Sequence, residues 1–360
     1  MLDLTELQHR VQHNCDLADA QHAGDYTLCT YLLRMREHYR WEQGLPAAAR
    51  IPKDDLSDWL TAREAHYEAL EQADWLPLKI AEQEFDAFEV DAINTALEPH
   101  GLYYGAGYGR GCRPLFFLAE LLEAEGEGAA QVNICGRELA RDLPAPVAMQ
   151  QNGRVIVRRH ALRQWLWEKF EEWDWRKRDN PLARAFRGAG FDQDPEQALE
   201  RFTEIVLPQV VAHEQGERLA GEQLGARWAE VLSGLGHSRA EILLRALRDH
   251  LADSLTTLPR LLSDLVRASA LESDAARAVH FYFANLTGMR KTLWPELRAG
   301  YDRWVETGLV SFLENEVEVA AARWSNLAQT VLKVADEGAV TDQAVHIEDW
   351  AIAEKLLLPK

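Results

Sequence analysis

Cysteine is scarce in this chain of 360 residues, which has only four of them: Cys15, Cys29, Cys112 and Cys135. No two of them form a Cys-x-x-Cys pair. A chain of this length can bury a sufficient apolar core without cross-links. The sequence therefore favours free thiols over a disulfide scaffold, and free thiols indicate a reducing, cytoplasmic compartment.

Long apolar runs are also missing. No stretch approaches the roughly 18–20 apolar residues that cross a bilayer as a helix. The first residues, MLDLTELQHR, are polar and amphipathic, unlike the apolar centre of a signal peptide. We therefore expect no membrane-spanning helix and a cytoplasmic location.

Positive charge is in short supply. The chain has 39 Lys and Arg against 58 Asp and Glu, a formal net charge of -19. Nucleic-acid binding needs a basic face, and anionic membrane surfaces attract basic segments. The charge therefore predicts neither a nucleic-acid nor a membrane partner. The charge is compatible with a small-molecule substrate and with a homo-oligomer.

Familiar nucleophile and phosphate-binding motifs are absent as well. There is no Gly-x-Ser-x-Gly elbow, and the glycine-rich stretch 105–111 is not followed by the Lys-Ser/Thr of a phosphate loop. Arg110 within this stretch and Arg113 just after it are our candidates for contacting an anion or another ligand. Alternatively, alternating glycines mark a bent or closely packed strand.

What the sequence does contain is helical periodicity. Apolar residues recur every three or four positions through the first hundred residues and again from His160 onward. Residues 101–158 instead hold β-like runs, two of which flank Asn152-Gly153, a strong hairpin signal. The pattern predicts a mainly α (α+β) protein, with a helical N-terminal part, a small antiparallel sheet around 101–158 and a C-terminal helical bundle.

Several details of this architecture follow from local signals. We expect a helical region with the small sheet over 1–175 and a helical bundle over 190–360, since the segment between them is charged and rich in turn residues. We expect Asp3 and Asp25 to cap the first two helices. The second helix should bury Leu28, Leu32, Met35 and Tyr39, a further helix should run from about 82 to 97, and Pro208 should kink the long helix that follows Pro195.

The helix expected over about 205–235 carries polar residues on its apolar side. At 100° per residue, an apolar stripe about 120° wide also contains His213, Glu214, Glu217 and Gly221. The apolar members of that stripe are Val210, Leu224, Trp228, Val231, Leu232 and Leu235. An unpaired buried carboxylate costs several kcal/mol or more, so these carboxylates must be paired, protonated or bound to a cation.

A metal ion is the leading interpretation of this pattern. His213 and Glu217, four residues apart, can point at one ion, and imidazole and carboxylate suit iron, manganese or zinc. Ferritin-like bundles use a related Glu-x-x-His spacing. We therefore expect a divalent metal ion as cofactor and a metal-dependent enzyme, with oxidase or oxygenase chemistry for iron or manganese and hydrolysis for zinc. Glu214 is the candidate catalytic acid or base.

Neighbouring helices supply further candidate ligands. Asp249 and Asp253 repel each other at a spacing of four residues, and a cation between them would reverse that effect. Both aspartates point away from the leucine stripe of their helix, so a solvated face is the alternative. His250 lies beside them, and His280 could contribute from a third helix or serve as a hydrogen-bonded core residue.

A second function class remains open. The polar residues could instead pair with arginines of facing helices, for which the candidates are Arg245, Arg248, Arg277 and Arg290. The protein would then be a non-catalytic assembly or adaptor protein with buried ion pairs in its core. Several of its twelve tryptophans would then serve an interface.

The stretch HNCDLADAQHAGDYTLC near the start is dense in ligand types. Cys15, His22 and Cys29 could form a zinc site, although their spacing is not a standard one. The alternative is a corner between two helices that buries its thiols.

The whole chain resembles an uncharacterised bacterial protein family of about 360 residues. The resemblance rests on HNCDLADAQHAGDYTLCTYLLRMREHYRW, on ICGREL, and on AHEQGE followed by RDHLADSLTTLP. No activity is known for that family, so the resemblance implies a shared architecture and transfers no function.

Overall fold

The first helix begins and buries the face that its sequence predicts. The side chain of Asp3 accepts a hydrogen bond from the Glu6 backbone N–H at 3.0 Å, which caps α1 (Leu4–His22). Leu7, Val11 and Cys15 along its apolar stripe are completely buried. The spacing of apolar residues and the capping residue are therefore sufficient to predict this helix from the sequence.

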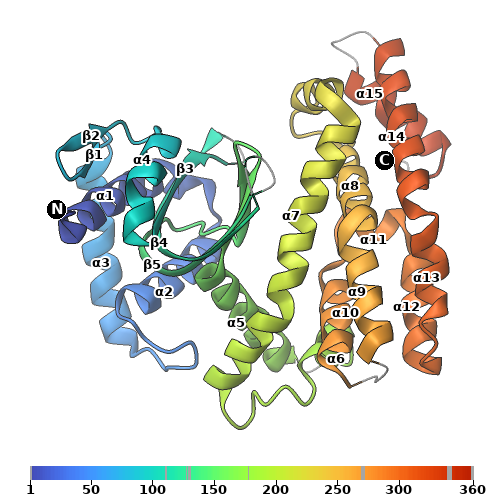
Figure 1. Ribbon diagram of the computed structural model, residues 1–360, viewed down its shortest axis with the longest axis horizontal. Helices are drawn as coiled ribbons and strands as arrows, with labels where there is room; N and C mark the ends of the chain where they lie inside the picture. The colour runs from blue at the N-terminus through green and yellow to red at the C-terminus, as the bar shows by residue number, and fades with distance from the viewer. Residues whose placement is uncertain are drawn as a thin grey trace. The chain divides into compact units, whose positions relative to one another are not determined.

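The computed structural model describes residues 2–109, 112–126, 128, 131–176, 178–268, 272–338 and 343–357. The chain divides into two compact units. Unit 1 comprises residues 1–169 and 191–203, and unit 2 comprises residues 170–190 and 204–360. Figure 1 shows the elements of both, and each unit is described by itself.

Unit 1 joins helices to a five-stranded sheet. Its helical elements are α1, the 3-10 turn η1 (Ala23–Asp25), α2 (Leu28–Glu42), α3 (Lys53–Leu70), α4 (Val90–Leu97) and the 3-10 turn η2 (Glu98–His100). Its strands are β1 (Leu78–Ile80), β2 (Gln83–Phe85), β3 (Leu102–Tyr108), β4 (Pro114–Glu125), β5 (Val132–Arg141), β6 (Ala148–Gln151) and β7 (Arg154–Arg158).

The larger sheet has the strand order β3-β4-β5-β7-β6. The predicted hairpin joins β6 to β7, and both of its turn residues, Asn152 (φ 50°) and Gly153 (φ 78°), adopt the left-handed conformation that such a two-residue turn requires. The sheet is mainly antiparallel, as expected, but β5 and β7 run parallel. The reason is that β6 lies at the edge and turns back, so β7 enters beside β5 in the same direction.

One face of this sheet holds the core of unit 1. Tyr104 of β3 and Phe116 of β4 are completely buried against the apolar faces of α1 and α4. The side chain of Asn94 in α4 bonds both the N–H and the C=O of Tyr104, at 2.8 Å each. The predicted helix over residues 82–97 is wrong in its first half. Residues 83–85 form strand β2, which pairs with β1 as a hairpin, and α4 begins only at Val90.

Two further expectations, the capping residue and the buried face of the second helix, α2, differ from the structure. It is capped by Thr27 instead of Asp25. Leu28 and Leu32 are 72% and 43% exposed, whereas Met35 is buried as predicted. The buried side of α2 carries three polar residues instead: Glu37, His38 and Arg40. Helical period alone could not identify this face, because it is buried by packing against Trp59, Tyr67 and Leu143 from the rest of unit 1.

Two helices are shared between the units, α5 (Arg159–Arg176) and α7 (Pro195–Gly234). The remaining helices of unit 2 are α6 (Pro181–Phe186), α8 (Arg239–Ala252), the π-helical turn η5 (Asp253–Thr257), α9 (Leu258–Ala268), α10 (Asp274–Asn285), α11 (Gly288–Leu293), α12 (Pro295–Thr307), α13 (Ser311–Glu318), α14 (Ala320–Glu337) and α15 (Gln343–Ala353). The mainly α prediction with a C-terminal helical part is thus confirmed. Within the described ranges, no helix is both long enough and apolar enough to cross a membrane.

Tryptophans dominate the core of unit 2. Trp228, Trp294, Trp304 and Trp324 are each at most 3% exposed. These four side chains stabilise the helical packing and are not available to a partner surface, so the expected interface role would fall to other tryptophans. Trp175, at 90% exposed, is the opposite case.

Helix α7 has a break at one glycine and a close contact at another. The chain stays helical through Pro208, where a kink was expected, and the non-helical residue is Gly225 (φ 73°). A neighbouring segment approaches α7 closely at Gly216 but not at Gly221. A Cβ at Gly216 would lie 2.4 Å from both the Ala252 carbonyl oxygen and Thr256 Oγ1, whereas a Cβ at Gly221 would meet nothing within 4 Å. Gly216 therefore allows α7 to contact the end of α8.

This pair of glycines gives a matched test of the α7 contact. We expect Gly216→Ala to lower the free energy of unfolding by about 1–3 kcal/mol, because its methyl group meets backbone. Gly221→Ala should be neutral or stabilise by up to about 1 kcal/mol through helix propensity. Urea denaturation followed by circular dichroism measures both. Equal effects of the two substitutions would contradict the close contact.

Candidate functional site

The structure brings four of the predicted ligands together at the contact between α7 and the α8–η5 segment. His213 Nδ1 lies 2.8 Å from Asp253 Oδ1, and His213 Nε2 lies 3.7 Å from Glu217 Oε1. Asp249 lies four residues before Asp253, on the same side of the α8–η5 segment as that residue. His213, Glu217 and Asp249 are half-buried, whereas the Asp253 side chain is only 1% exposed.

The buried face of α7 nonetheless differs from the predicted one. Ala212, Gly216 and Ala220 form its fully buried line, His213 and Glu217 flank that line on one side, and Glu214 lies on the far side of the helix. Small residues occupy this line because the backbone of Ala252 lies directly against it. Of the predicted trio, His213 and Glu217 are therefore at the edge of a helix contact.

Asp253 is the centre of the cluster. Besides His213, its carboxylate accepts a hydrogen bond from the Tyr282 hydroxyl at 2.8 Å and pairs with the guanidinium of Arg290. Burial alone would raise the pKa of Asp253, but Arg290 and His213 hold it well below its usual range. Asp253 is thus a fully buried carboxylate that stays ionised because three donors surround it.

The surrounding carboxylates also have cationic neighbours. Arg248 Nη2 lies 2.8 Å from Glu217 Oε1 and 3.5 Å from Asp249 Oδ1. Burial raises the pKa of Asp249, which Arg290 and Arg248 partly oppose. The expectation that an arginine of a facing helix pairs with the α7 residues is confirmed for Arg248, which pairs with Glu217, whereas Arg290 pairs with Asp253. Arg245 and Arg277 instead pair with Glu241 and Asp274 of their own helices.

The remaining predicted ligands lie elsewhere. His250 Nε2 lies 2.8 Å from the Arg290 carbonyl oxygen, and its ring stacks on Trp324. His280 Nδ1 lies 3.0 Å from the Tyr301 hydroxyl. Burial lowers the pKa of each histidine to about 4, so both are neutral core residues. Glu214 is half-buried beside His213.

A metal ion does not fit this donor set well. The carboxylates that would bind it, Asp253 and Glu217, already contact Arg290 and Arg248. A cation placed between them would meet two guanidinium groups as well as the protonated ring of His213. Within the described ranges, no three His, Cys, Asp or Glu side chains are grouped so that they could hold a metal ion.

The N-terminal candidate ligands are likewise separated. Cys15 is buried and its thiol donates to the Phe116 carbonyl oxygen at 3.1 Å, His22 pairs with Asp25, and Cys29 is exposed. The two thiols therefore have different environments. The alternative of a helix corner with buried thiols is therefore confirmed for Cys15 and wrong for Cys29.

Of the two predicted anion-binding arginines, Arg110 lies outside the described residues. Arg113 is buried, and its Nη2 donates to Asp19 Oδ1 at 2.8 Å. Its guanidinium also lies 4.8 Å from the centre of the Tyr26 ring. Arg113 therefore holds a carboxylate of the protein itself.

Sequence reasoning missed a larger buried polar network in unit 1. Glu138 accepts a hydrogen bond from Arg158 Nε at 2.6 Å and pairs with Arg141, while Arg158 Nη1 donates to Asp142 at 2.9 Å. All four side chains are at most 3% exposed. Burial alone would raise the pKa of Glu138, but Arg158 and Arg141 lower it to about 2. The network is therefore ionised.

His38 belongs to the same region. It is 2% exposed, and neither of its ring nitrogens has a hydrogen-bond partner among the described residues. Burial, together with Arg63 and Arg141, lowers its pKa to about 3, so the ring is neutral. It packs between Trp41 and Trp59, with ring centres 5.1 and 6.1 Å away.

One sequence signal could have revealed part of this network. Asp19 lies four residues after Cys15, about 40° from it around α1, at the edge of the apolar stripe. The same rule that identified His213 therefore applies to Asp19, which is completely buried. Glu138 and Arg158 lie on strands, and no local pattern distinguishes them from solvent-facing residues.

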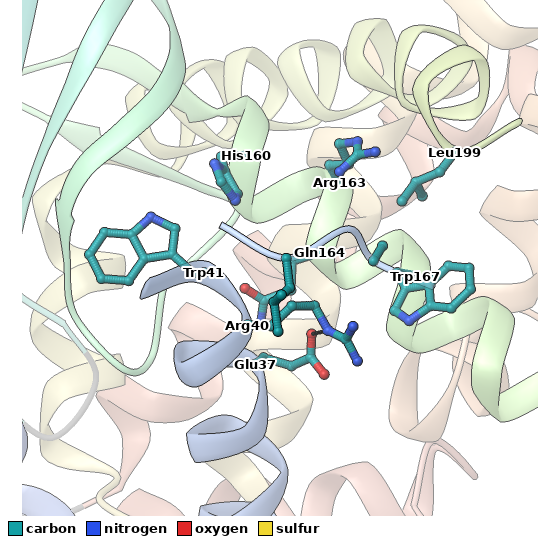
Figure 2. A pocket seen from close by; sticks show the side chains of 10 residues that line it. Glu37, Arg40, Trp41, His160, Arg163, Gln164, Trp167 and Leu199 are labelled. Atoms are coloured by element: carbon teal, nitrogen blue, oxygen red, sulfur yellow. Dashed lines mark ion pairs between the residues drawn. The ribbon is translucent and has the colours of Figure 1, made fainter. Parts of the chain in front are cut away.

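A small cavity lies beside the network, between α2 and α5 (Figure 2). Its volume is about 40 Å³, which suits one or two water-sized groups. Glu37 and Arg40 on its α2 side pair at 3.3 Å, and Arg163 on its α5 side pairs with Glu196 and Glu200. The cavity is too small for an organic ligand, and its charges have partners within unit 1.

The His213–Asp253 pair predicts a pH dependence. Burial alone would lower the pKa of His213, but Asp253 raises it to about 9, against about 6.5 in the unfolded chain. The unfolded chain loses this proton first, so the stabilisation is complete below about pH 6.5 and is lost as the pH rises through 9. We expect a loss of about 3 kcal/mol over this interval, measured by urea denaturation.

His213→Gln is the control for this prediction, because glutamine cannot titrate. The variant should lack the additional loss between pH 6.5 and 9. A wild-type protein with the same pH dependence as this variant would contradict the raised pKa of His213.

Comparison with known proteins assigns the family. Two models of a family of unknown function (DUF6866) match the chain, the N-terminal domain over residues 6–158 and the C-terminal domain over residues 163–353. No curated protein and no solved structure matches the chain. The matches meet near the start of α5 and together cover most of the sequence. The expected resemblance to a family without a known activity is therefore confirmed, and the chain belongs to the DUF6866 family.

Proposed function

We propose that this chain is a non-catalytic assembly or adaptor protein whose core is held by buried ion pairs. The observation that carries the proposal is the environment of Asp253. Its carboxylate has a histidine, a tyrosine and an arginine as partners, and these occupy three of the roughly four acceptor positions that a carboxylate offers. The predicted catalytic constellation is therefore better explained as a structural one.

The charge balance of the cluster supports the same proposal. His213, Arg248 and Arg290 face Glu217, Asp249 and Asp253, so three positive groups meet three negative ones. Each of the three carboxylates has a cationic side chain of the protein within 3.5 Å, which fits a role in fixing the contact between α7 and α8.

An exposed apolar surface supports an assembly function. Leu28, Leu32 and Leu33 lie near the start of α2 and are 72%, 43% and 56% exposed. Neighbouring exposed leucines are typical of protein interaction surfaces. Cys29 lies among them and is also exposed. We call this group, residues 28–33, the α2 leucine surface.

The environment of the protein is part of the proposal. Cys15, Cys29, Cys112 and Cys135 are all free, and two of them are exposed, which supports a reducing, cytoplasmic location. The net charge of -19 supports a protein partner over a nucleic acid or an anionic membrane. A second copy of the chain remains one such partner.

A double-mutant cycle tests the structural role of the ion pairs. Removing one member of a buried ion pair leaves the other charge buried without a partner. We therefore expect Arg290→Met to lower the free energy of unfolding by about 3–5 kcal/mol. Asp253→Asn together with Arg290→Met should cost less than the sum of the two single substitutions. Urea denaturation followed by tryptophan fluorescence measures the cycle.

The exposed pair Arg267–Asp264, at 2.8 Å, provides the control. The same substitutions there should change the unfolding free energy by less than about 1 kcal/mol. If Arg290→Met were as mild as Arg267→Met, the buried ion pair would not hold the core, and the proposal would lose its main support.

Cross-linking tests the assembly function directly. Cys29 and Cys112 are exposed, whereas Cys15 and Cys135 are buried and should react slowly. We expect a short thiol cross-linker on Cys29 in cells, in a Cys112→Ser variant, to give one discrete cross-linked species. The same reagent on Cys112, in a Cys29→Ser variant, is the control. No discrete species from Cys29 would contradict an interface at the α2 leucine surface.

A further inference from the structure

Unit 1 contains a groove that the proposed function does not use. It lies between α1, α2 and α3, and its volume is about 500 Å³. Small-molecule sites in proteins commonly measure roughly 300–1,000 Å³. Its lining includes Gln12, Asp16, Trp41, Trp59 and His66. The groove therefore has the size and the mixture of polar and aromatic groups of a ligand site.

The polar wall of the groove is preorganised around Asp16. This carboxylate, 7% exposed, accepts from Gln12 Nε2 at 2.8 Å, from Arg63 Nη1 at 3.1 Å and from His66 Nε2 at 3.1 Å. Because Asp16 only accepts, His66 must carry its proton on Nε2. In the neutral ring, Nδ1 is then a hydrogen-bond acceptor. The His66 side chain is 47% exposed, so this acceptor is accessible to a ligand.

Two indole rings form the aromatic part of the groove. Each ring already uses its N–H group, since Trp41 Nε1 donates to the Glu138 carbonyl oxygen and Trp59 Nε1 to Glu42, both at 3.2 Å. His38 packs behind them and fixes their positions. What the indoles offer a ligand is therefore ring surface, and not further hydrogen bonds.

The charges of the groove limit the class of ligand. Arg63 is shared between the carboxylates of Asp16 and Glu42, so an anionic ligand would meet two carboxylates and a guanidinium that is already bound. A cationic ligand would compete with Arg63, whose guanidinium lies 5.1 Å from the centre of the Trp59 ring. A purely apolar ligand would leave the polar wall without partners.

We propose that this groove binds a neutral ring that bears several hydroxyl groups, the chemistry of a mono- or disaccharide. The indole rings of Trp41 and Trp59 contact the apolar face of the ligand. A ligand hydroxyl donates to His66 Nδ1, and the carboxamide of Gln8 binds a further hydroxyl. The Asp16 carboxylate acts as a positioning group that fixes the His66 ring.

Saturation-transfer NMR on the full-length chain tests this proposal. The probes are glucose, galactose, N-acetylglucosamine and cellobiose, with glucose phosphate as the anionic comparison and choline as the cationic one. We expect saturation transfer to at least one neutral sugar and weaker transfer to both charged probes. No transfer to any of the four neutral sugars, or preference for a charged probe, would overturn the proposal.

Two variants locate the binding site. His66→Leu removes the acceptor, and Trp59→Leu removes an aromatic surface, so each should weaken sugar binding by about tenfold or more. His100→Gln, an exposed histidine of unit 1 outside the groove, is the matched control and should bind as the wild type does. His66 is half exposed, so its variant remains informative if Trp59→Leu fails to fold. Sugar binding that is unchanged in His66→Leu would overturn the assignment to this groove.

Discussion

The structure of unit 2 depends on a carboxylate that is completely buried and yet ionised. Asp253 is stable in that state because His213, Tyr282 and Arg290 approach it from α7, α10 and α11. Removing a charge from water costs more than one ion pair returns, so all three partners are needed. This requirement fixes where those helices meet the α8–η5 segment. Gly216 makes the approach of α7 sterically feasible.

Unit 1 follows the same principle with different elements. Glu138, Asp142 and Asp19 are buried against Arg158, Arg141 and Arg113, so three carboxylates meet three guanidinium groups here, where the unit 2 cluster has two guanidinium groups and one histidine ring. In each unit the charged residues come from segments far apart in the sequence. Ion pairs of this kind stabilise little relative to an apolar core, but a single missing partner is costly, and this favours one arrangement of the chain. An acidic protein can in this way bury many carboxylates.

The sequence predicted the fold class and the elements whose signals are local. The Asp3 cap, the apolar stripe of α1 and the Asn152-Gly153 hairpin are of this kind, since each depends on a few neighbouring residues. The predicted α2 face and the predicted helix over residues 82–89 were wrong, because distant partners decide which side of α2 is buried and whether residues 83–85 pair as a strand. The parallel pairing of β5 with β7 depends on the path of the chain between these strands, which cannot be predicted from a local sequence pattern.

The candidate site was predictable to a similar extent. The helical wheel predicted that His213 and Glu217 share one side of α7, and the two side chains contact each other in the structure. The wheel put Asp253 on the solvent side of α8, yet α7 and α10 cover that side, so the residue is completely buried. Arginine partners were among the predicted alternatives, but sequence could not choose between them and a metal ion. That choice depends on which long side chains reach the carboxylates.

The central claim is that the cluster around Asp253 is an internal ion-pair network. Metal content, measured by plasma mass spectrometry, tests it most directly. The chain is purified without a metal-affinity tag and equilibrated with iron, manganese and zinc. We predict a metal-to-protein ratio near zero for each. A ratio near one that is lost in Glu217→Leu or Asp253→Asn would contradict the account, because those carboxylates would then be metal ligands.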